Sequence, residues 1–278
     1  MPEGMKLSFA TLGCPGWTLE QIAANARATG YDGVELRGAA GEHIGPEERP
    51  AECARIRKLF AAQGVAIASI MGYTRFTVAD PQAQAENHKV LEGYIGVARE
   101  VGCPIVRIFG GQRDGADLAG NIRRVVEALK PLAERAQRSG VRLALETHDD
   151  WCVGANARAI LDGVASPALG LCWDVGNTFF VEPMETTFAA IRGRITHVHF
   201  KDVASVDGQA RNTLPGMGQV DLRQALSLLH GSGYTGYLSF EWEKKWDASL
   251  AEPEVAFPHY ARFVTNLMRE LGVPRGSA

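Results

Sequence analysis

The sequence alternates short β-rich runs with longer alanine-rich stretches, and this alternation limits the possible folds more than any other feature. Eight runs have strand composition, and each is followed by a stretch in which apolar residues recur at helical spacing. The predicted strands are KLSFAT (6–11), GVELR (33–37), VAIASIM (65–71), PIVRIF (104–109), VRLALET (141–147), LGLCWD (169–174), ITHVHF (195–200) and GYLSFE (236–241). Strands that alternate with helices predict a parallel sheet covered by those helices.

The helices that follow these strands are equally regular. They are predicted over residues 18–30, 51–64, 84–102, 118–140, 156–165, 185–193, 222–233 and 257–271. Four of them end in a glycine just before the next strand, as is typical of a helix C-cap: Gly30, Gly64, Gly102 and Gly140. Residues 201–221 show neither pattern, so we expect a long irregular loop there, and loops of that length are often functional.

Eight strand–helix units with no break in composition predict a closed (β/α)8 TIM barrel, as a single domain over residues 1–278. The alternative is an open, doubly wound sheet. That fold would place a glycine-rich phosphate-binding turn after the first strand, and LGCPGW (12–17) does not match GxGxxG. The closed barrel is therefore the preferred prediction.

Charge and composition argue against several classes of partner. The net charge of −3 gives no electrostatic basis for binding nucleic acid or an anionic membrane. No apolar run approaches the ~20 residues of a membrane span, and the N-terminus lacks signal-peptide features. The five scattered cysteines form no CxxC and are typical of free thiols in a reducing compartment. We expect a cytoplasmic protein with a small-molecule ligand.

The last four strands end in side chains that suit a divalent metal. In a TIM barrel, the C-terminal strand ends surround one mouth, where chemistry takes place. These strands end in Glu146, Asp174, His199 and Glu241. Taken singly, a glutamate at a strand end is more often an ordinary ion-pair carboxylate. Four such residues on consecutive strands suit one cation such as Mn, Mg, Co or Zn, which would also balance carboxylates that are costly to bury unpaired.

Two histidines on the seventh strand are predicted to face the barrel interior. His197 and His199 lie two residues apart, so both side chains point to the same side of the sheet. His199 is nearer the mouth and is the expected ligand, whereas His197 is expected to be a hydrogen-bonded core histidine. His148 follows Glu146 by two residues and is predicted either to contact substrate or to cap its loop.

Several charged residues near the strand ends are further candidates. Arg107 lies inside the fourth strand and should meet a carboxylate, because an unpaired buried guanidinium is costly. Lys201 follows His199 by two residues and should face the same mouth. We expect Arg107, Lys201 and His148 to contact substrate hydroxyl groups or an oxyanion. Glu35 and Arg37, at the end of the second strand, are weaker candidates.

Five motifs resemble one known superfamily. LALETH (143–148), CWDVGN (172–177), HVHFKD (197–202), PGMGQVD (215–221) and LSFEWE (238–243) are similar to motifs of the sugar phosphate isomerase/epimerase superfamily, the xylose-isomerase-like TIM barrels. The resemblance covers nearly the whole chain. It implies one divalent metal ion, with Mn favoured, bound by residues matching Glu146, Asp174, His199 and Glu241. It also implies a homo-oligomer.

The superfamily contains ketose 3-epimerases, aldose–ketose isomerases, inosose and dehydroshikimate dehydratases, C-glycoside-cleaving lyases and endonuclease-IV-type nucleases. Ketose 3-epimerases usually carry a histidine where this chain has Asn177, and an arginine shortly after the metal histidine, for which the nearest equivalent is Arg211. Asn177 and Arg211 are thus candidate substrate contacts, but the 3-epimerase assignment is weakened. The nucleases need extra histidines at earlier strand ends, and SIMGYTR (69–75) offers none.

These residues predict a metal-dependent isomerase or epimerase of a sugar or keto-sugar. A carboxylate beside the metal would remove the proton next to a carbonyl, giving a metal-stabilised enediolate. Glu146 and Glu241 are the expected catalytic residues: a base and an acid on opposite faces would give epimerisation, and one residue doing both would give isomerisation. A leaving group β to the carbanion would instead give a dehydratase or lyase. A non-catalytic sugar-binding barrel is the remaining alternative, disfavoured by the complete ligand set.

Overall fold

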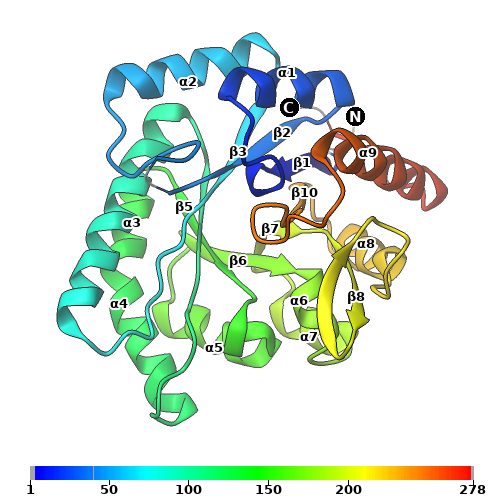
Figure 1. The fold of residues 1–278 in the computed structure, drawn as a ribbon. Helices are drawn as coiled ribbons and strands as arrows, with labels where there is room; N and C mark the ends of the chain where they lie inside the picture. The colour runs from blue at the N-terminus through cyan, green and yellow to red at the C-terminus, as the bar shows by residue number, and fades with distance from the viewer. Residues whose placement is uncertain (1–3, 40, 277–278) are drawn as a thin grey trace.

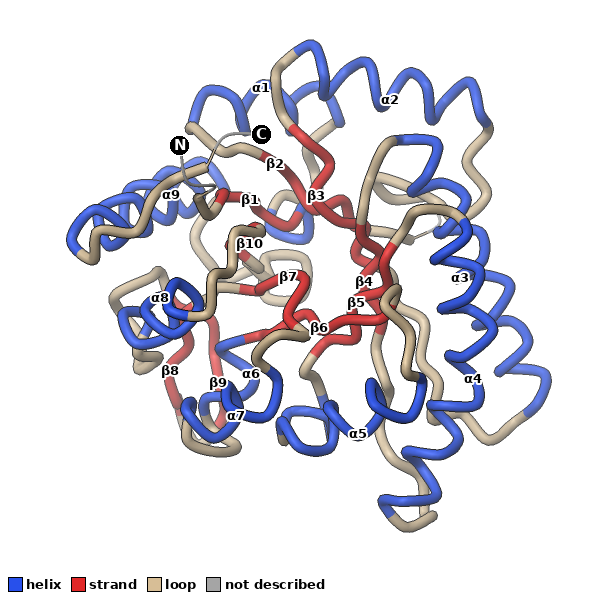
Figure 2. Tube along the Cα trace, turned by 180° about the vertical axis from the view of Figure 1, so that it is seen from behind, coloured by secondary structure: helices blue, strands red, loops and turns tan. Residues whose placement is uncertain are grey.

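The computed structural model describes residues 4–39 and 41–276, and these form a closed barrel of parallel strands surrounded by helices (Figure 1). The strands follow one another around the barrel in the order β1-β10-β7-β6-β5-β4-β3-β2, and β1 closes it by pairing with both β10 and β2. Figure 2, the view from behind, shows the ring of strands inside the helices. The predicted TIM barrel is confirmed. Residues 1–3, 40 and 277–278 of the predicted domain lie outside the described residues.

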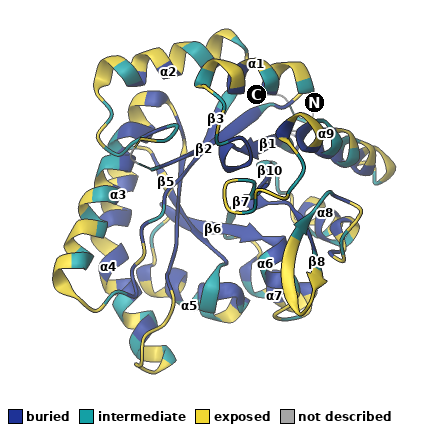
Figure 3. Cartoon of the chain, in the orientation of Figure 1, coloured by how far each residue is buried: buried dark blue, intermediate teal, exposed yellow. Residues whose placement is uncertain are grey.

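Every barrel strand lies within the segment predicted for it. The strands are β1 (Lys6–Ala10), β2 (Gly33–Arg37), β3 (Ala66–Met71), β4 (Ile105–Ile108), β5 (Arg142–Glu146), β6 (Leu169–Asp174), β7 (Ile195–His199) and β10 (Tyr237–Phe240). They are almost entirely buried, as the dark blue strands of Figure 3 show. Most of their buried apolar side chains form one large core cluster with those of the surrounding helices, whereas Ala10 with Met71, and Ile105 with Ala144 and Cys172, form two small separate clusters.

The eight predicted helices are present, with shifted ends. They are α1 (Leu19–Thr29), α2 (Pro50–Ala62), α3 (Pro81–Val101), α4 (Leu118–Arg138), α5 (Gly154–Val164), α7 (Met184–Ile191), α8 (Leu222–Gly231) and α9 (Pro253–Glu270). Helix α3 begins three residues earlier than predicted, because the Asp80 side chain caps it and Pro81 suits its first turn. The four predicted C-cap glycines all have positive φ, between 63° and 77°. A short helix, α6 (Val175–Phe179), was not predicted.

The expectation of an irregular loop over residues 201–221 was wrong for residues 202–213, whereas residues 214–221 contain neither helix nor strand. Strands β8 (Asp202–Val206) and β9 (Gln209–Thr213) form an antiparallel hairpin. Asp207 and Gly208 join them with φ of 52° and 77°, the left-handed conformation of a two-residue type I′ turn. These two residues provide the turn that allows the hairpin to form. Apolar and polar residues alternate too weakly in the flanking segments for the sequence to predict the two strands.

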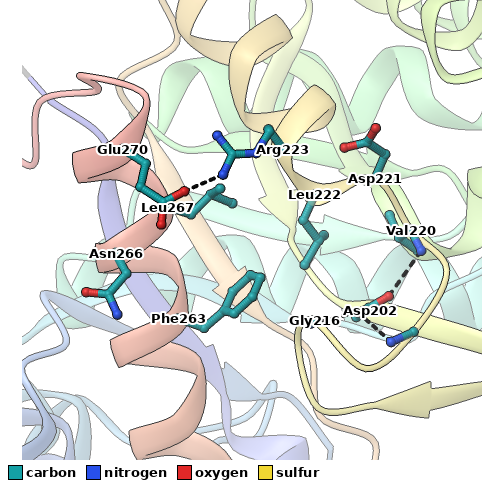
Figure 4. Close-up of a pocket in the computed structure, with 11 residues that line it drawn as sticks. Asp202, Gly216, Val220, Asp221, Leu222, Arg223, Phe263, Asn266, Leu267 and Glu270 are labelled. Atoms are coloured by element: carbon teal, nitrogen blue, oxygen red, sulfur yellow. Dashed lines mark hydrogen bonds and ion pairs between the residues drawn. The ribbon is translucent and has the colours of Figure 1, made fainter.

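The chain after the hairpin is fixed by one buried carboxylate. Asp202 accepts backbone hydrogen bonds from Gly216, Gly218 and Val220 at 2.8–3.1 Å. Figure 4 shows Asp202 beside a cavity of about 440 Å³ that also borders α8 and α9. These bonds turn the chain from β9 into α8, whose first turn is capped by Asp221.

Two further findings bear on the expectations from composition. The five cysteines are free, as predicted, and all five are buried. Within the described part of the chain, no helix combines the length and the apolar character needed to cross a membrane.

Candidate active site

The structure brings the four predicted metal ligands together. Glu146 and Asp174 end β5 and β6, His199 ends β7, and Glu241 directly follows β10. One atom from each lies within 4.8 Å of the others. His199 Nδ1 is 3.6 Å from Glu146 Oε2, 3.5 Å from Asp174 Oδ2 and 3.4 Å from Glu241 Oε1. All four residues are buried.

Three atoms of this cluster have no hydrogen-bond partner, although all three are buried: Glu146 Oε2, Asp174 Oδ2 and His199 Nδ1. Buried polar atoms are rarely left unpaired, because each one costs free energy. A tetrahedral ion with ligand bonds of about 2.1 Å places neighbouring ligand atoms about 3.4 Å apart. The spacing around His199 Nδ1 is close to that value, so the cluster fits a divalent metal ion.

The other carboxylate oxygens of the cluster are held by neighbouring residues. Asn177 donates its backbone N–H to Asp174 Oδ1 at 2.8 Å and its side-chain Nδ2 to Glu146 Oε1 at 3.3 Å. Lys201 Nζ donates to Glu241 Oε2 at 2.6 Å. Each carboxylate therefore keeps one oxygen fixed while its second oxygen faces the cluster. Such outer contacts orient the ligands of a metal site.

Glu35 supports His199 from inside the barrel. Its Oε2 contacts His197 Nε2 at 3.2 Å and His199 Nε2 at 3.1 Å, and accepts a hydrogen bond from Ser239 Oγ at 3.0 Å. Burial would raise the pKa of Glu35, but the charges of His199 and His197 hold it well below its usual value. An ionised carboxylate only accepts hydrogen bonds, so Nε2 carries a hydrogen and Nδ1 faces the cluster. Burial lowers the pKa of His199, but the charges of its neighbours, among them Glu241, Glu35 and Glu146, outweigh burial and raise it well above its usual value, so a metal ion would displace the Nδ1 proton.

Three residues of this network were not predicted, or were predicted only weakly, from the sequence. Glu35 was only a weak candidate at the barrel rim, whereas it is fully buried inside the barrel. Ser239 and Glu243, which contact Glu35 and Lys201 respectively, were not predicted. The sequence signal that could have placed Glu35 inside the barrel was its position in the middle of the buried strand β2. His197 is the hydrogen-bonded core histidine that was expected.

Two buried cations lie against the cluster. Arg107 Nε is 3.0 Å from Glu146 Oε2, and its Nη1 donates to the carbonyl of Gly72 at 2.8 Å, which confirms that this arginine meets a carboxylate. Neither Arg107 Nε nor Lys201 Nζ is aligned to form a hydrogen bond with the unpaired oxygen nearby. Lys201 Nζ lies 2.6–2.9 Å from three carboxylates: Asp174, Glu241 and Glu243.

Negative charge exceeds positive charge at this end of the barrel. Arg107, Lys201 and a protonated His199 face five carboxylates: Glu35, Glu146, Asp174, Glu241 and Glu243. Burial, opposed by Arg107 and reinforced by Glu241, raises the pKa of Glu146 to about 7. Burial acts in the same direction on Asp174, but Lys201 and His199 outweigh it and hold that pKa well below its usual value. A divalent cation would reduce the excess of negative charge.

The two remaining predicted substrate contacts differ in position. His148 lies at the rim, where its Nδ1 is 3.0 Å from Asp149 Oδ2 and its ring packs 4.6 Å from that of Phe109. Arg211 is exposed on β9, and no hydrogen bond or ion pair joins its side chain to another described residue. The structure therefore brings His148, but not Arg211, near the cluster. The hairpin, which the sequence did not predict, holds Arg211 in solvent.

Comparisons with known proteins agree with this fold. The family model described as xylose isomerase-like TIM barrel matches residues 23–266. The chain is 26% identical over 253 residues to fructoselysine 3-epimerase of Shigella flexneri, covering 85% of this chain and 90% of that one. It is 22% identical over 292 residues to inosose dehydratase of Serratia proteamaculans, covering 90% and 93%. The crystal structure of the IOLI protein with a zinc atom has the same fold, with a TM-score of 0.81 at 19% identity and coverage of 96% and 99%.

Proposed function

Because the chain belongs to the xylose isomerase-like TIM barrel family, we propose that it is a divalent-metal-dependent epimerase or isomerase of a sugar or keto-sugar. The observation that carries this proposal is the convergence of three buried ligand atoms from Glu146, Asp174 and His199, none of which makes a hydrogen bond. With Glu241 they would hold one ion. We propose Mn as the ion, with Mg, Co and Zn as the alternatives, because three of the four ligands are carboxylates. The relative named fructoselysine 3-epimerase supports the reaction class.

The two glutamates are the proposed acid–base pair. When bound, the metal ion would supply positive charge to a carbonyl oxygen and a neighbouring hydroxyl of the substrate, making the adjacent C–H more acidic. Glu146 and Glu241 stand on opposite sides of the cluster, because β6 and β7 separate β5 from β10. One carboxylate would remove the proton and the other would return a proton to the opposite face. If a single carboxylate performs both steps, the product is the 1,2-isomer.

The cations of the site would stabilise negative charge on the substrate. Lys201 and Arg107 are buried beside the carboxylates, so each is held in place before the substrate arrives. Fixed charges in a site that excludes water stabilise a developing oxyanion without reorganisation. Asn177 would orient Glu146 through its side-chain amide. Arg211 has no role in this proposal.

Elimination is the second candidate reaction, and His148 is the residue that favours it. Burial lowers the pKa of His148, but the hydrogen bond to Asp149 and the charge of Glu146 outweigh burial and raise it. A protonated imidazole at the rim could donate its proton to a departing hydroxyl or glycosidic oxygen. The relative named inosose dehydratase is consistent with such chemistry. Under this alternative, His148→Asn would slow elimination far more than proton exchange.

The proposal is tested by incubating the Mn-loaded protein in deuterated water with ketoses, keto-inositols and 3-keto-glycosides. We expect deuterium to enter the carbon next to the carbonyl of at least one compound, and the product then distinguishes epimerase, isomerase and lyase. Glu241→Gln should reduce exchange by at least ~100-fold, because it removes an acid–base group. Glu134→Gln, on the exposed face of α4, is the matched control. No exchange with any compound would instead favour the non-catalytic sugar-binding barrel.

A further inference from the structure

Each carboxylate of the four-residue cluster lies beside a cation of the protein itself. Lys201 Nζ is 2.9 Å from Asp174 Oδ2 and 2.6 Å from Glu241 Oε2. Arg107 Nε is 3.0 Å from Glu146 Oε2. Asp174 Oδ2 and Glu146 Oε2 are also the buried oxygens that make no hydrogen bond and that the proposed site assigns to the metal ion. The ion therefore has to share both oxygens with positive charges of the protein.

Arg107 is fixed in this arrangement. Among the described residues, its guanidinium pairs with no carboxylate other than Glu146. Its Nη1 donates to the carbonyl of Gly72 at 2.8 Å, and its guanidinium carbon lies 4.0 Å from the ring centre of Phe109 and 4.9 Å from that of Tyr73. A planar group held by a hydrogen bond and two rings has no second position to adopt.

Lys201, in contrast, has a carboxylate partner outside the ligand set. Its Nζ donates to Glu243 Oε1 at 2.8 Å. The side chain of Glu243, in the loop after β10, is 33% exposed, whereas that of Lys201 is 2% exposed. Burial lowers the pKa of Lys201, but Asp174, Glu241 and Glu243 outweigh burial and raise it well above its usual value, so the ammonium stays charged. Glu243 can therefore retain this charge when an ion takes the oxygen of Asp174.

The stem of Lys201 is confined by the short helix α6. A Cβ atom at Gly176 would lie 3.0 Å from Lys201 Cγ and 3.1 Å from Cε, which is closer than ordinary packing allows. The lysine stem thus passes over α6 at a place where glycine leaves room for it. Its ammonium can shift between neighbouring carboxylates but stays beside the cluster.

The charge of Lys201 acts oppositely on the two states of the site. In the metal-free state it offsets the repulsion between Asp174 and Glu241, which are both buried. An ion about 2.1 Å from Asp174 Oδ2 would lie within about 5 Å of Lys201 Nζ, because that nitrogen is 2.9 Å from the same oxygen. Two positive charges at this separation repel strongly where water does not screen them. Lys201 thus stabilises the metal-free site and opposes the metal-bound one.

We propose that Lys201 is a resident cation that lowers the affinity of the cluster for its metal ion, and that Glu243 is a positioning residue that draws Lys201 away from Asp174. This inference rests on the proposed function, which supplies the ion, and it gives Glu243 a role that the proposed reaction does not use. The ion should exchange more readily than it would from the same four ligands without the lysine.

The test is a competition titration of Mn against a chelating dye at about pH 8, where a gain of affinity cannot come from a damaged site. Lys201→Met keeps an unbranched stem and removes the charge, so Mn should bind about tenfold more tightly or better. Glu243→Gln should weaken binding about fivefold, because the ammonium then rests on Asp174 and Glu241 alone. Lys245→Met removes a charge that pairs with Glu42 at 3.1 Å and should change affinity by less than about twofold.

The variant with both substitutions shows whether Glu243 acts through Lys201. Its direct attraction for the ion is weakened by solvent, because its side chain is 33% exposed. In the Lys201→Met background, Glu243→Gln should therefore change Mn affinity by less than about twofold. Differential scanning calorimetry gives a second measurement. Lys201→Met should lower the Tm measured in EDTA and widen the difference between the Tm with Mn and the Tm with EDTA.

Equal or weaker Mn binding by Lys201→Met would overturn the inference, since the lysine would then help to assemble the ligands. An equal effect of Glu243→Gln with and without Lys201 would overturn the role of Glu243. If the wild type binds one Mn ion and Lys201→Met does not raise its affinity, the metal centre stands and the resident cation fails. If neither protein binds Mn, the metal centre of the proposed function fails, and the inference fails with it.

Discussion

At the level of single residues, the cluster is held in place from outside before any ligand arrives. Glu146, Asp174 and Glu241 each have one oxygen bonded to a neighbour, and His199 has one nitrogen bonded to Glu35. One further ligand atom of each of these four residues lies within 4.8 Å of the others. Affinity for a metal should therefore depend on residues that never touch it.

Glu35 gives the sharpest test of this dependence. Glu35→Gln removes the negative charge that keeps the hydrogen on His199 Nε2, so we expect metal affinity to fall roughly 10- to 100-fold. A competition titration with a chelating dye measures this without reference to activity. Ser239→Ala, which removes one donor but keeps the charge, should have a smaller effect, and Glu134→Gln should have none. Unchanged affinity in Glu35→Gln would show that Glu35 does not position His199.

Metal binding should also depend on pH. The pKa of Glu146 is about 7 in the metal-free protein, so this carboxyl is mostly protonated below that pH. The metal binds only the carboxylate and the neutral imidazole, and the pKa of His199 is raised well above its usual value, so affinity should fall by more than tenfold per pH unit below pH 7 and less steeply above it. Titrations with Mn between about pH 6 and pH 8 measure this slope. A flat profile would contradict the role of Glu146 as a ligand.

The sequence contained more information about the four ligand positions than about their surroundings. Strand ends are readable from composition, and parallel strands of a barrel end at one mouth, so Glu146, Asp174, His199 and Glu241 could be grouped without coordinates. Contacts across the barrel interior, such as that between Glu35 and His199, depend on strand tilt and register, which composition does not specify.

At the level of elements, the sequence again predicted the buried barrel strands better than the exposed structure around them. The eight barrel strands were predictable because buried parallel strands are continuous apolar runs. The hairpin of β8 and β9 was missed because its exposed strands lack such a run. Asp207–Gly208 was its one clear signal, since Asp-Gly is a preferred pair for a type I′ turn.

Asp202 should be the residue that holds the hairpin and the following loop to the barrel. Asp202→Ala would leave the backbone N–H groups of Gly216, Gly218 and Val220 without their acceptor, so we expect a loss of about 3 kcal/mol in the free energy of unfolding. Urea unfolding measures this loss. Asp207→Asn, a substitution that a type I′ turn tolerates, should change stability by less than about 0.5 kcal/mol. A similar small effect for Asp202→Ala would refute this role.

At the level of the whole molecule, the site depends on closure of the barrel. Its residues come from β5, β6, β7 and the end of β10, and β10 is held in the ring by pairing with β1 on one side and β7 on the other. Near the chain ends, Met5 and Arg275 form a further bridge. An ion bound by four strands of one closed sheet should therefore stabilise the entire fold.

Chelation should lower the melting temperature. A ligand present at 100 times its Kd stabilises the native state by about 2.7 kcal/mol, which corresponds to several degrees in a chain of this length. We expect treatment with EDTA to lower Tm by that amount and added Mn to restore it, as followed by differential scanning calorimetry. Asp174→Asn should melt at the same temperature with and without Mn. A wild-type Tm that changes with neither EDTA nor Mn would argue against a metal ion bound by these four strands.

The central claim is that one divalent ion binds at the Glu146–Asp174–His199–Glu241 cluster. Anomalous diffraction from crystals grown with Mn tests it most directly. The account predicts a single strong peak about 2.0–2.3 Å from Glu146 Oε2, Asp174 Oδ2, His199 Nδ1 and Glu241 Oε1. No peak there, or a peak among Glu35, His197 and His199 instead, would contradict it.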